Sequence, residues 1–148
     1  GHGSVLCARV LHHAGVRDIA VATLTEGIRL RRAGVRGTIL ILGYTAPEEA
    51  ELLVGYRLTQ AVVDEDYAMR LASQGWHVHV HVAVDTGMRR IGVKVSDMET
   101  YHRVSALRDC FRTCAPPIWR TAEANHLPTG RSRPSSGWLP GFAGKDIL

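Results

Sequence analysis

Four glycines recur at nearly equal intervals along the first half of the chain. Gly15, Gly34, Gly55 and Gly75 lie 19, 21 and 20 residues apart, and each follows an amphipathic stretch and precedes an apolar, β-branched run. Glycine commonly ends a helix, because its backbone adopts the left-handed conformation needed there without steric cost. The spacing therefore predicts helices that alternate with strands, as in parallel βα units.

The apolar runs predict strands at 18–23, 38–43, 58–63 and 77–85. Helices are expected at 4–14, 65–74 and 97–108. Asp64 would cap the helix at 65–74, and Ser96 with Glu99 has the spacing of a capping box before 97–108. Thr45 with Glu48 has the same spacing and predicts a further helix start. Right-handed βα connections leave an open doubly wound sheet or a barrel as the α/β architectures. A (β/α)8 barrel needs about 250 residues, so a barrel of this kind would be partial here, with four strands and their helices in 1–108.

Composition and charge exclude several classes of protein. The chain is 45% hydrophobic and 22% charged, which is typical of a soluble globular domain. No apolar run approaches the roughly 20 residues needed to span a bilayer, so no membrane segment is predicted in this chain. The net charge of +4 comes from basic residues that look scattered and lack interleaved aromatics, and nucleic-acid binding is therefore not expected. Three cysteines without zinc-ligand spacing indicate a reducing cytoplasm.

One predicted strand leads directly into a loop rich in charge and glycine, in the run HVHVHVAVDTGMRRIG at 77–92. Alternation places the histidines, Ala83 and Asp85 on one face and the valines on the other. In both candidate architectures, ligand sites gather at the carboxyl ends of the strands. The segment from Asp85 to Arg90 is therefore a candidate site.

Three interpretations of this segment stay open on spacing alone. The histidines can be core or surface residues beside a solvated loop. His79 and His81 can be metal ligands, since imidazoles two apart on a strand converge on zinc, which would suit a metal-dependent barrel hydrolase; no third ligand is evident, so no metal residue is assigned. The loop can instead bind an anion or cofactor, because glycines admit close backbone approach and a guanidinium is permanently charged.

Several segments, in order, resemble the amino-terminal half of alanine racemases. They are GHG (1–3), AVATLTEGIRLRRAGV (20–35), ILILGYTAPEEAELL (39–53), LTQAVVDEDYA (58–68) and HVHVAVDTGMRRIG (79–92). The middle segments are especially similar to serine/alanine racemases associated with vancomycin resistance. The resemblance implies a TIM barrel carrying pyridoxal 5'-phosphate, a second β-rich domain and a homodimer. It implies an isomerase that interconverts L- and D-alanine, or serine, for peptidoglycan precursors, in the bacterial cytoplasm or as the cytoplasmic domain of a membrane-anchored racemase.

The resemblance also implies roles for individual residues. Arg90 corresponds to the arginine that hydrogen-bonds the phenolic oxygen of the cofactor, whereas Arg89 falls at a variable position and is expected to be a solvated neighbour. His2 and Gly3 belong to the GHG motif and would start the first helix near the cofactor. Many relatives carry a carbamylated lysine that steadies the arginine, and this chain has Ala83 there.

No catalytic residue is expected within these 148 residues. The resemblance places the Schiff-base lysine directly before the GHG motif and takes a catalytic tyrosine from the partner subunit, so the polypeptide as given is expected to be inactive. A related alternative is a non-catalytic barrel protein that binds pyridoxal phosphate; such proteins generally lack a loop of the DTGM type.

Residues 109–148 show neither helical nor strand periodicity, and they contain five of the six prolines. They are predicted to form an irregular tail, either disordered or translated out of frame. Read one base out of frame with suitable codons, CFRTCAPPIW gives LSHLCAADL, which resembles the motif that follows in the family. We therefore hypothesise a frameshift near 108–110, which the nucleotide sequence tests directly.

Overall fold

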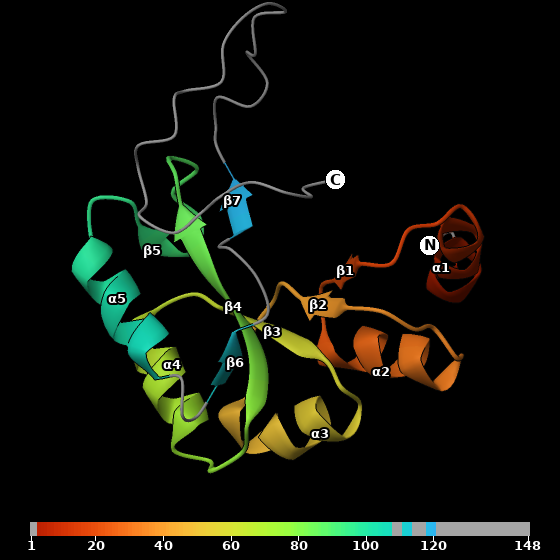
Figure 1. Cartoon of the computed structure of the whole chain (residues 1–148), viewed down its shortest axis with the longest axis horizontal. Coiled ribbons are helices and arrows are strands. Elements are labelled where there is room, and N and C mark those ends of the chain that lie inside the picture. The colour runs from red at the N-terminus through yellow and green to blue at the C-terminus, as the bar shows by residue number, and fades with distance from the viewer. Residues whose placement is uncertain (1–2, 108–110, 114–117, 121–148) are drawn as a thin grey trace, which may run out of the picture.

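The computed structural model describes residues 3–107, 111–113 and 118–120. Its centre is a parallel sheet in the order β1-β2-β3-β4-β5, with β6 and β7 also paired to β4 (Figure 1). The strands are β1 (Ile19–Val21), β2 (Ile39–Ile41), β3 (Thr59–Val62), β4 (Val78–Asp85), β5 (Val93–Lys94), β6 (Phe111–Thr113) and β7 (Ile118–Arg120). The four strands expected from the sequence are confirmed, and so is their parallel α/β arrangement.

The helices cover one side of this sheet. They are α1 (Ser4–His13), α2 (Leu24–Arg32), the 3-10 turn η1 (Pro47–Glu49), α3 (Ala50–Gly55), α4 (Glu65–Ala72) and α5 (Met98–Ala106). Figure 1 shows α2, α3, α4 and α5 following one another around the strands, while α1 stands apart beyond β1. This is the arrangement of successive βα units in a curved, open sheet.

The core lies between the strands and these helices. Ile39, Ile41 and Val78 from the sheet are fully buried, and they belong to one apolar cluster with Leu53 and Leu71 from the helices. Each such side chain contributes about 1.5–3 kcal/mol when removed from water. The valines of β4 therefore hold the strand against the helix layer and leave its other face to the histidines.

Two helix starts agree with local sequence rules. Asp64 caps α4 as predicted, because its carboxylate accepts a 2.7 Å hydrogen bond from the backbone N–H of Tyr67. Thr23 and Glu26 form a complete capping box on α2, which is not among the predicted caps. Both caps follow directly after strands and fix the direction of the next helix.

Two predicted capping boxes are wrong. Asp97, not Ser96, caps α5 by accepting from the N–H of Thr100 at 3.1 Å, because the helix begins at Met98, one residue later than predicted. The segment after Thr45 starts as a 3-10 turn with Pro47 in its first turn and no side-chain cap. Proline sets the helical φ there by itself, and the Thr45 hydroxyl is buried without a hydrogen-bond partner among the described residues.

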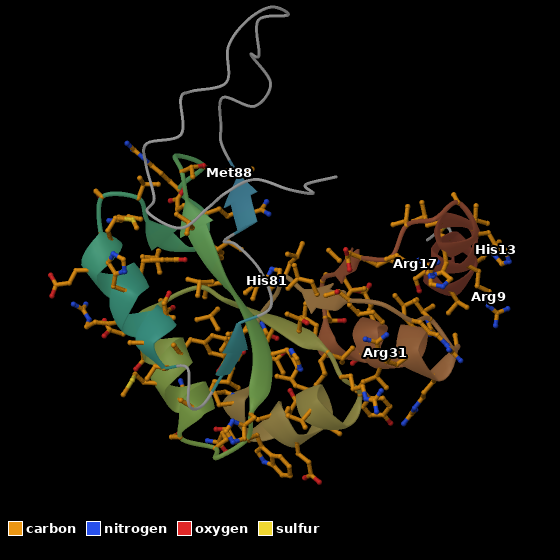
Figure 2. All side chains as sticks on the ribbon, in the orientation of Figure 1. Arg9, His13, Arg17, Arg31, His81 and Met88 are labelled. Carbon is orange, nitrogen blue, oxygen red and sulfur yellow. The ribbon has the colours of Figure 1, made fainter. Side chains whose placement is uncertain are left out.

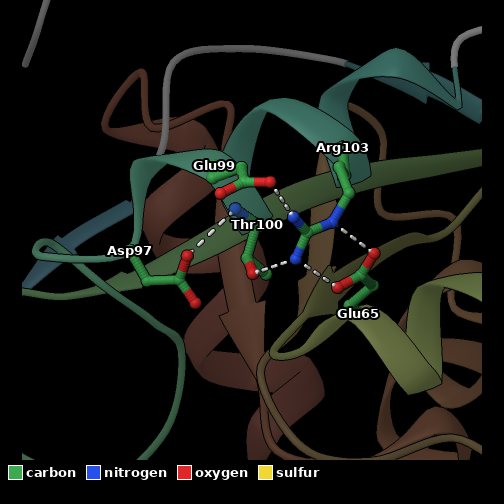
Figure 3. Close-up of polar contacts among 5 residues, drawn as sticks. All are labelled: Glu65, Asp97, Glu99, Thr100 and Arg103. Atoms are coloured by element: carbon green, nitrogen blue, oxygen red, sulfur yellow. Dashed lines mark hydrogen bonds and ion pairs between the residues drawn. The ribbon is translucent and has the colours of Figure 1, made fainter.

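Helices α4 and α5 are joined by one surface cluster (Figure 3). The guanidinium of Arg103 donates to both carboxylate oxygens of Glu65, at 2.7 and 2.9 Å, and to Glu99 at 2.8 Å. The hydrogen bonds from Arg103 lower the pKa of the Glu65 carboxyl. The cluster is exposed to solvent, so it adds little stability even with bidentate geometry.

Two strands lie within the segment predicted to be irregular. β6 pairs with β4 at Val78–Val80 and β7 pairs with it at Ala83–Asp85. An unpaired strand edge presents a row of free N–H and C=O groups. β6 and β7 can pair with these groups through their backbones, although their sequences show no strand periodicity. The rest of 109–148 lies outside the described residues. The frameshift hypothesis near 108–110 is not tested by the structure and stays a prediction. None of the described helices has the length and apolar character needed to traverse a bilayer.

Candidate functional site

The carboxyl ends of the strands surround a cavity of about 460 Å³. Its walls are mostly small or apolar, and they consist of Ala20, Val21, Ala22, Leu42, Gly43, Ala61, Ala83, Val84, Arg90 and Ile91. Backbone hydrogen bonds continue the pairing past the strand ends, from Leu42 N to Val21 O at 2.9 Å and from Gly43 N to Ala22 O at 3.1 Å. The cavity is therefore built on the sheet itself, where α/β proteins place their ligands.

A buried amide supports the rim of this cavity. Gln60 is fully buried on β3, and its Nε2 donates to the carbonyl oxygens of Gly43 at 2.8 Å and Ala61 at 2.9 Å. Both acceptors line the cavity. A buried polar group is costly unless it is hydrogen-bonded, so these contacts tie the loop after β2 to the neighbouring strand. The sequence reading placed Gln60 in a strand and did not identify this role.

The loop after β4 folds back on the strand that it leaves. The Oδ1 atom of Asp85 accepts hydrogen bonds from the backbone N–H groups of Gly87 and Arg89, each at 2.9 Å. These bonds are the main reason that the pKa of the Asp85 carboxyl lies below its ordinary value. The carboxylate thus acts inside the loop, as an acceptor for its backbone.

Glycine is required where this loop closes. Gly92 has φ +111°, and a Cβ added there would lie 2.9 Å from both the carbonyl oxygen of Ala83 and the N–H nitrogen of Asp85. The next residues form β5, which pairs with the last residues of β4. A larger residue at Gly92 would therefore force the backbone of β4 to shift where the loop returns.

Arg90 lies between the cavity and a second hollow. This hollow has a volume of about 720 Å³ and is lined by the loop, including Asp85, Arg89 and Lys94. Arg90 lines both, whereas Arg89 lines only the outer one. Ala83, where the resemblance implies a lysine in many relatives, forms part of the cavity wall and supplies no charge. No salt bridge to Arg90 forms within the part of the chain that the structure describes.

Gly3, the one residue of the GHG motif that the structure describes, does not line this cavity. Gly3 precedes α1 with φ +83° and lines neither hollow. His2 lies outside the described residues. Asp85, Arg89 and Arg90 thus line one hollow, and Gly3 lies at the start of a helix.

The histidines of β4 alternate with its valines as predicted. His79 and His81 are half-buried between buried valines, and Figure 2 shows His81 near the middle of the strand. Burial lowers the pKa of His81, partly offset by Asp18, so the neutral imidazole is favoured. Among residues 3–107 and the short strands after them, no three His, Cys, Asp or Glu side chains are grouped as metal ligands.

A cluster of arginines at the opposite end of the strands was missed from the sequence. Arg31, Arg32, Arg36 and Arg57 line a hollow of about 690 Å³ beside the loops that lead into β2 and β3. The run RLRRAGVRG at 29–37 is the sequence signal for this cluster, and the basic residues are therefore less scattered than the sequence analysis predicts. The structure shows that Arg31 has an internal role, since it donates to four backbone carbonyls.

Comparison with known proteins identifies the family. The model of the family described as "Alanine racemase, N-terminal domain" matches residues 1–112. The serine/alanine racemase of Enterococcus gallinarum is 45% identical over 93 residues, which are 63% of this chain and 13% of that protein. The alanine racemase of Carboxydothermus hydrogenoformans is 41% identical over 113 residues, which are 74% of this chain and 31% of that protein. The chain thus spans less than a third of the length of these relatives.

A solved structure agrees in fold as well as sequence. The alanine racemase of Clostridium difficile 630, in complex with cycloserine, superposes with a TM-score of 0.64 and 36% identity, over 72% of this chain and 30% of that one. The predicted fold class, a partial barrel of the alanine racemase type, is confirmed, and the family favours a racemase over a metal-dependent hydrolase. With the family match over residues 1–112, the chain belongs to the alanine racemase family, of which it carries part of the N-terminal domain.

Proposed function

We propose that this chain is the cofactor-binding part of a pyridoxal-phosphate-dependent amino-acid racemase. The observation that carries the proposal is the position of Arg90, which is the one charged residue among the described residues that line the cavity at the strand ends. Ligand pockets typically combine mostly apolar walls with a few placed polar groups. The names of the relatives, alanine racemase and serine/alanine racemase, support alanine or serine as the substrate.

The residues at the cavity fit this cofactor. Its ring is flat and aromatic, and the small side chains of Ala20, Ala61 and Ala83 leave room for it beside the strands. Arg90 would donate to the anionic phenolic oxygen of the ring. Pyridoxal phosphate supplies an electron sink for negative charge at the α-carbon of an amino acid. The task of this chain is then to bind the ring, orient it and exclude water from one of its faces.

We propose a homodimeric racemase for the intact protein, by analogy with the family that the sequence resembles. The same analogy takes the catalytic tyrosine from the partner subunit. This chain contributes the wall that holds the cofactor, and residues elsewhere in the protein move the protons.

Replacing Arg90 by alanine is expected to weaken the binding of pyridoxal phosphate to the 148-residue chain by about 10- to 150-fold. This range corresponds to the 1.5–3 kcal/mol that a hydrogen bond to a charged group contributes. Isothermal titration calorimetry at constant salt measures the affinity. Arg89→Ala is the matched control. It removes the same charge from the neighbouring residue, whose side chain lines only the outer hollow.

A loss below about twofold in Arg89→Ala shows that the effect is local to Arg90 and not a general attraction of the loop for anions. Equal losses in the two variants, or no loss in either, would contradict the proposed site.

We also expect no racemisation by the 148-residue polypeptide alone. It spans 13% and 31% of the two racemases compared above, and the resemblance places both proton-transferring groups outside these residues. Incubation with L-alanine or L-serine and pyridoxal phosphate, followed by chiral chromatography, measures the product. Formation of D-alanine or D-serine above the level given by free cofactor would contradict this expectation.

A further inference from the structure

The loop that carries Arg90 is attached to β4 at both of its ends. On the side of β5, Val93 and Lys94 pair with Val84 and Asp85, and the N–H of Val95 donates to the carbonyl oxygen of Asp85 at 3.2 Å. On the side of β4, the attachment is the carboxylate of Asp85, which accepts from Gly87 and Arg89. Arg90 lies between these two attachments.

Packing contributes little to the shape of this loop. The two large apolar side chains of the loop, Met88 and Ile91, are 46% and 47% exposed, and Figure 2 shows Met88 at the tip, away from the sheet. No apolar side chain of the loop is buried between Asp85 and Gly92. Hydrogen bonds must therefore hold the backbone in place.

One residue of the backbone held by Asp85 is in a conformation that L-residues avoid. Arg89 has φ +54°, in the left-handed region, whereas Gly87 has φ +133°, which glycine adopts without steric cost. The Asp85 carboxylate binds the N–H groups of these same two residues. Arg89 immediately precedes Arg90, so its backbone angles set the direction in which the Arg90 side chain leaves the loop.

We propose that Asp85 is a positioning residue for Arg90: its carboxylate holds the loop in the left-handed turn that directs the Arg90 guanidinium to the cavity. The resemblance implies that a carbamylated lysine at position 83 holds this arginine in many relatives. Ala83 has no polar group for that role, and Asp85 would perform it through the loop backbone. The inference rests on the proposed function, because the purpose of the turn is to present Arg90 to the cofactor.

The test compares Asp85→Ala and Asp85→Asn in the 148-residue chain, with pyridoxal phosphate as the probe. Asp85→Ala is expected to weaken binding about tenfold or more, whereas Asp85→Asn keeps an oxygen acceptor and should stay within about threefold of the unchanged chain. Amide hydrogen exchange by NMR should accelerate at Gly87 and Arg89 in the alanine variant and much less in the asparagine variant.

Two further variants separate positioning from general damage. Asp97→Ala removes a similar bond from a carboxylate to a backbone N–H, at the start of α5, and should leave the cofactor affinity unchanged. The double variant Asp85→Ala with Arg90→Ala should bind no more weakly than Arg90→Ala alone, because both changes remove one interaction.

The outcomes distinguish this inference from the function on which it rests. If Arg90→Ala weakens binding and Asp85→Ala does not, positioning by Asp85 is wrong and the cofactor site stands. If the losses of the two single variants add in full, or if folded Asp85→Asn loses as much as Asp85→Ala, Asp85 does not act through its acceptor oxygen. If Arg90→Ala itself has no effect, the cofactor site is wrong.

Discussion

Replacing Gly37 by alanine is expected to lower the free energy of unfolding by about 3 kcal/mol or more, which combines left-handed strain with steric overlap. Gly37 has φ +85°, and a Cβ added there would overlap the backbone carbonyl oxygen of Arg17 and lie 3.0 Å from its carbonyl carbon. The neighbouring N–H of Ile19 donates to Thr38 O at 3.0 Å, in the first rung between β1 and β2. An added methyl group would push these two strands apart where their pairing begins.

Gly34→Ala provides a matched control for this change. Gly34 has nearly the same φ, +84°, but a Cβ there would meet nothing within 4 Å. This variant should lose only the left-handed strain, about 1 kcal/mol. Urea denaturation followed by circular dichroism measures both losses, and equal losses would mean that the approach of Arg17 to Gly37 is not a close contact in solution.

The regular part of the fold could be predicted from the sequence because its signals are local. Strands β1 to β4 are apolar runs that follow helix ends, and Gly15, Gly34 and Gly75 have the positive φ expected of a residue that ends a helix. Gly55 is different, since the left-handed residue at this helix end is Arg57, with φ +50°. The repeat thus located the helix end correctly and assigned the left-handed conformation to the wrong residue.

The candidate site was located from topology alone, whereas its internal contacts were not. The carboxyl ends of parallel strands meet at one edge, so the loop after β4 was expected at the edge where β1 and β2 also end. The bonds from Asp85 to Gly87 and Arg89 depend on how a seven-residue loop returns to β5. A strand of two residues, Val93–Lys94, is too short to show any periodicity.

Contacts between distant loops were also beyond the sequence. Arg31 reads as one of several exposed arginines on a helix, and only the fold brings Tyr56 and Arg57 next to it. Strands β6 and β7 were missed for the same reason, because their pairing is set by the open edge of β4 and not by their own residues. Non-local hydrogen bonds leave no pattern in a single sequence.

Replacing Arg31 by methionine is expected to lower the free energy of unfolding by about 3 kcal/mol, within the range for hydrogen bonds of a charged donor that is partly exposed. Its Nε donates to Tyr56 O at 2.9 Å and its Nη1 to Val35 O at 2.9 Å, while Nη2 reaches Gly37 O and Arg57 O, both at 2.8 Å. Methionine keeps the apolar stem and removes every donor. Four carbonyl groups in the loops before β2 and β3 would then lose their partner.

Arg29→Met, on the same helix, is the control for the loss of charge and of helix propensity. Arg29 is exposed, so its replacement should lower the free energy of unfolding by less than about 0.5 kcal/mol, as surface substitutions usually do. Chemical denaturation measures both variants. Similar losses would contradict a stabilising role for the four hydrogen bonds of Arg31.

Arg31 binds the loops at the amino ends of the strands, whereas Arg90 lies at their carboxyl ends. Folded Arg31→Met should therefore bind pyridoxal phosphate as well as the unchanged chain. Loss of stability without loss of affinity would show that Arg31 serves stability and Arg90 serves binding. In barrels of this type the amino-terminal face typically serves stability and the carboxyl-terminal face function.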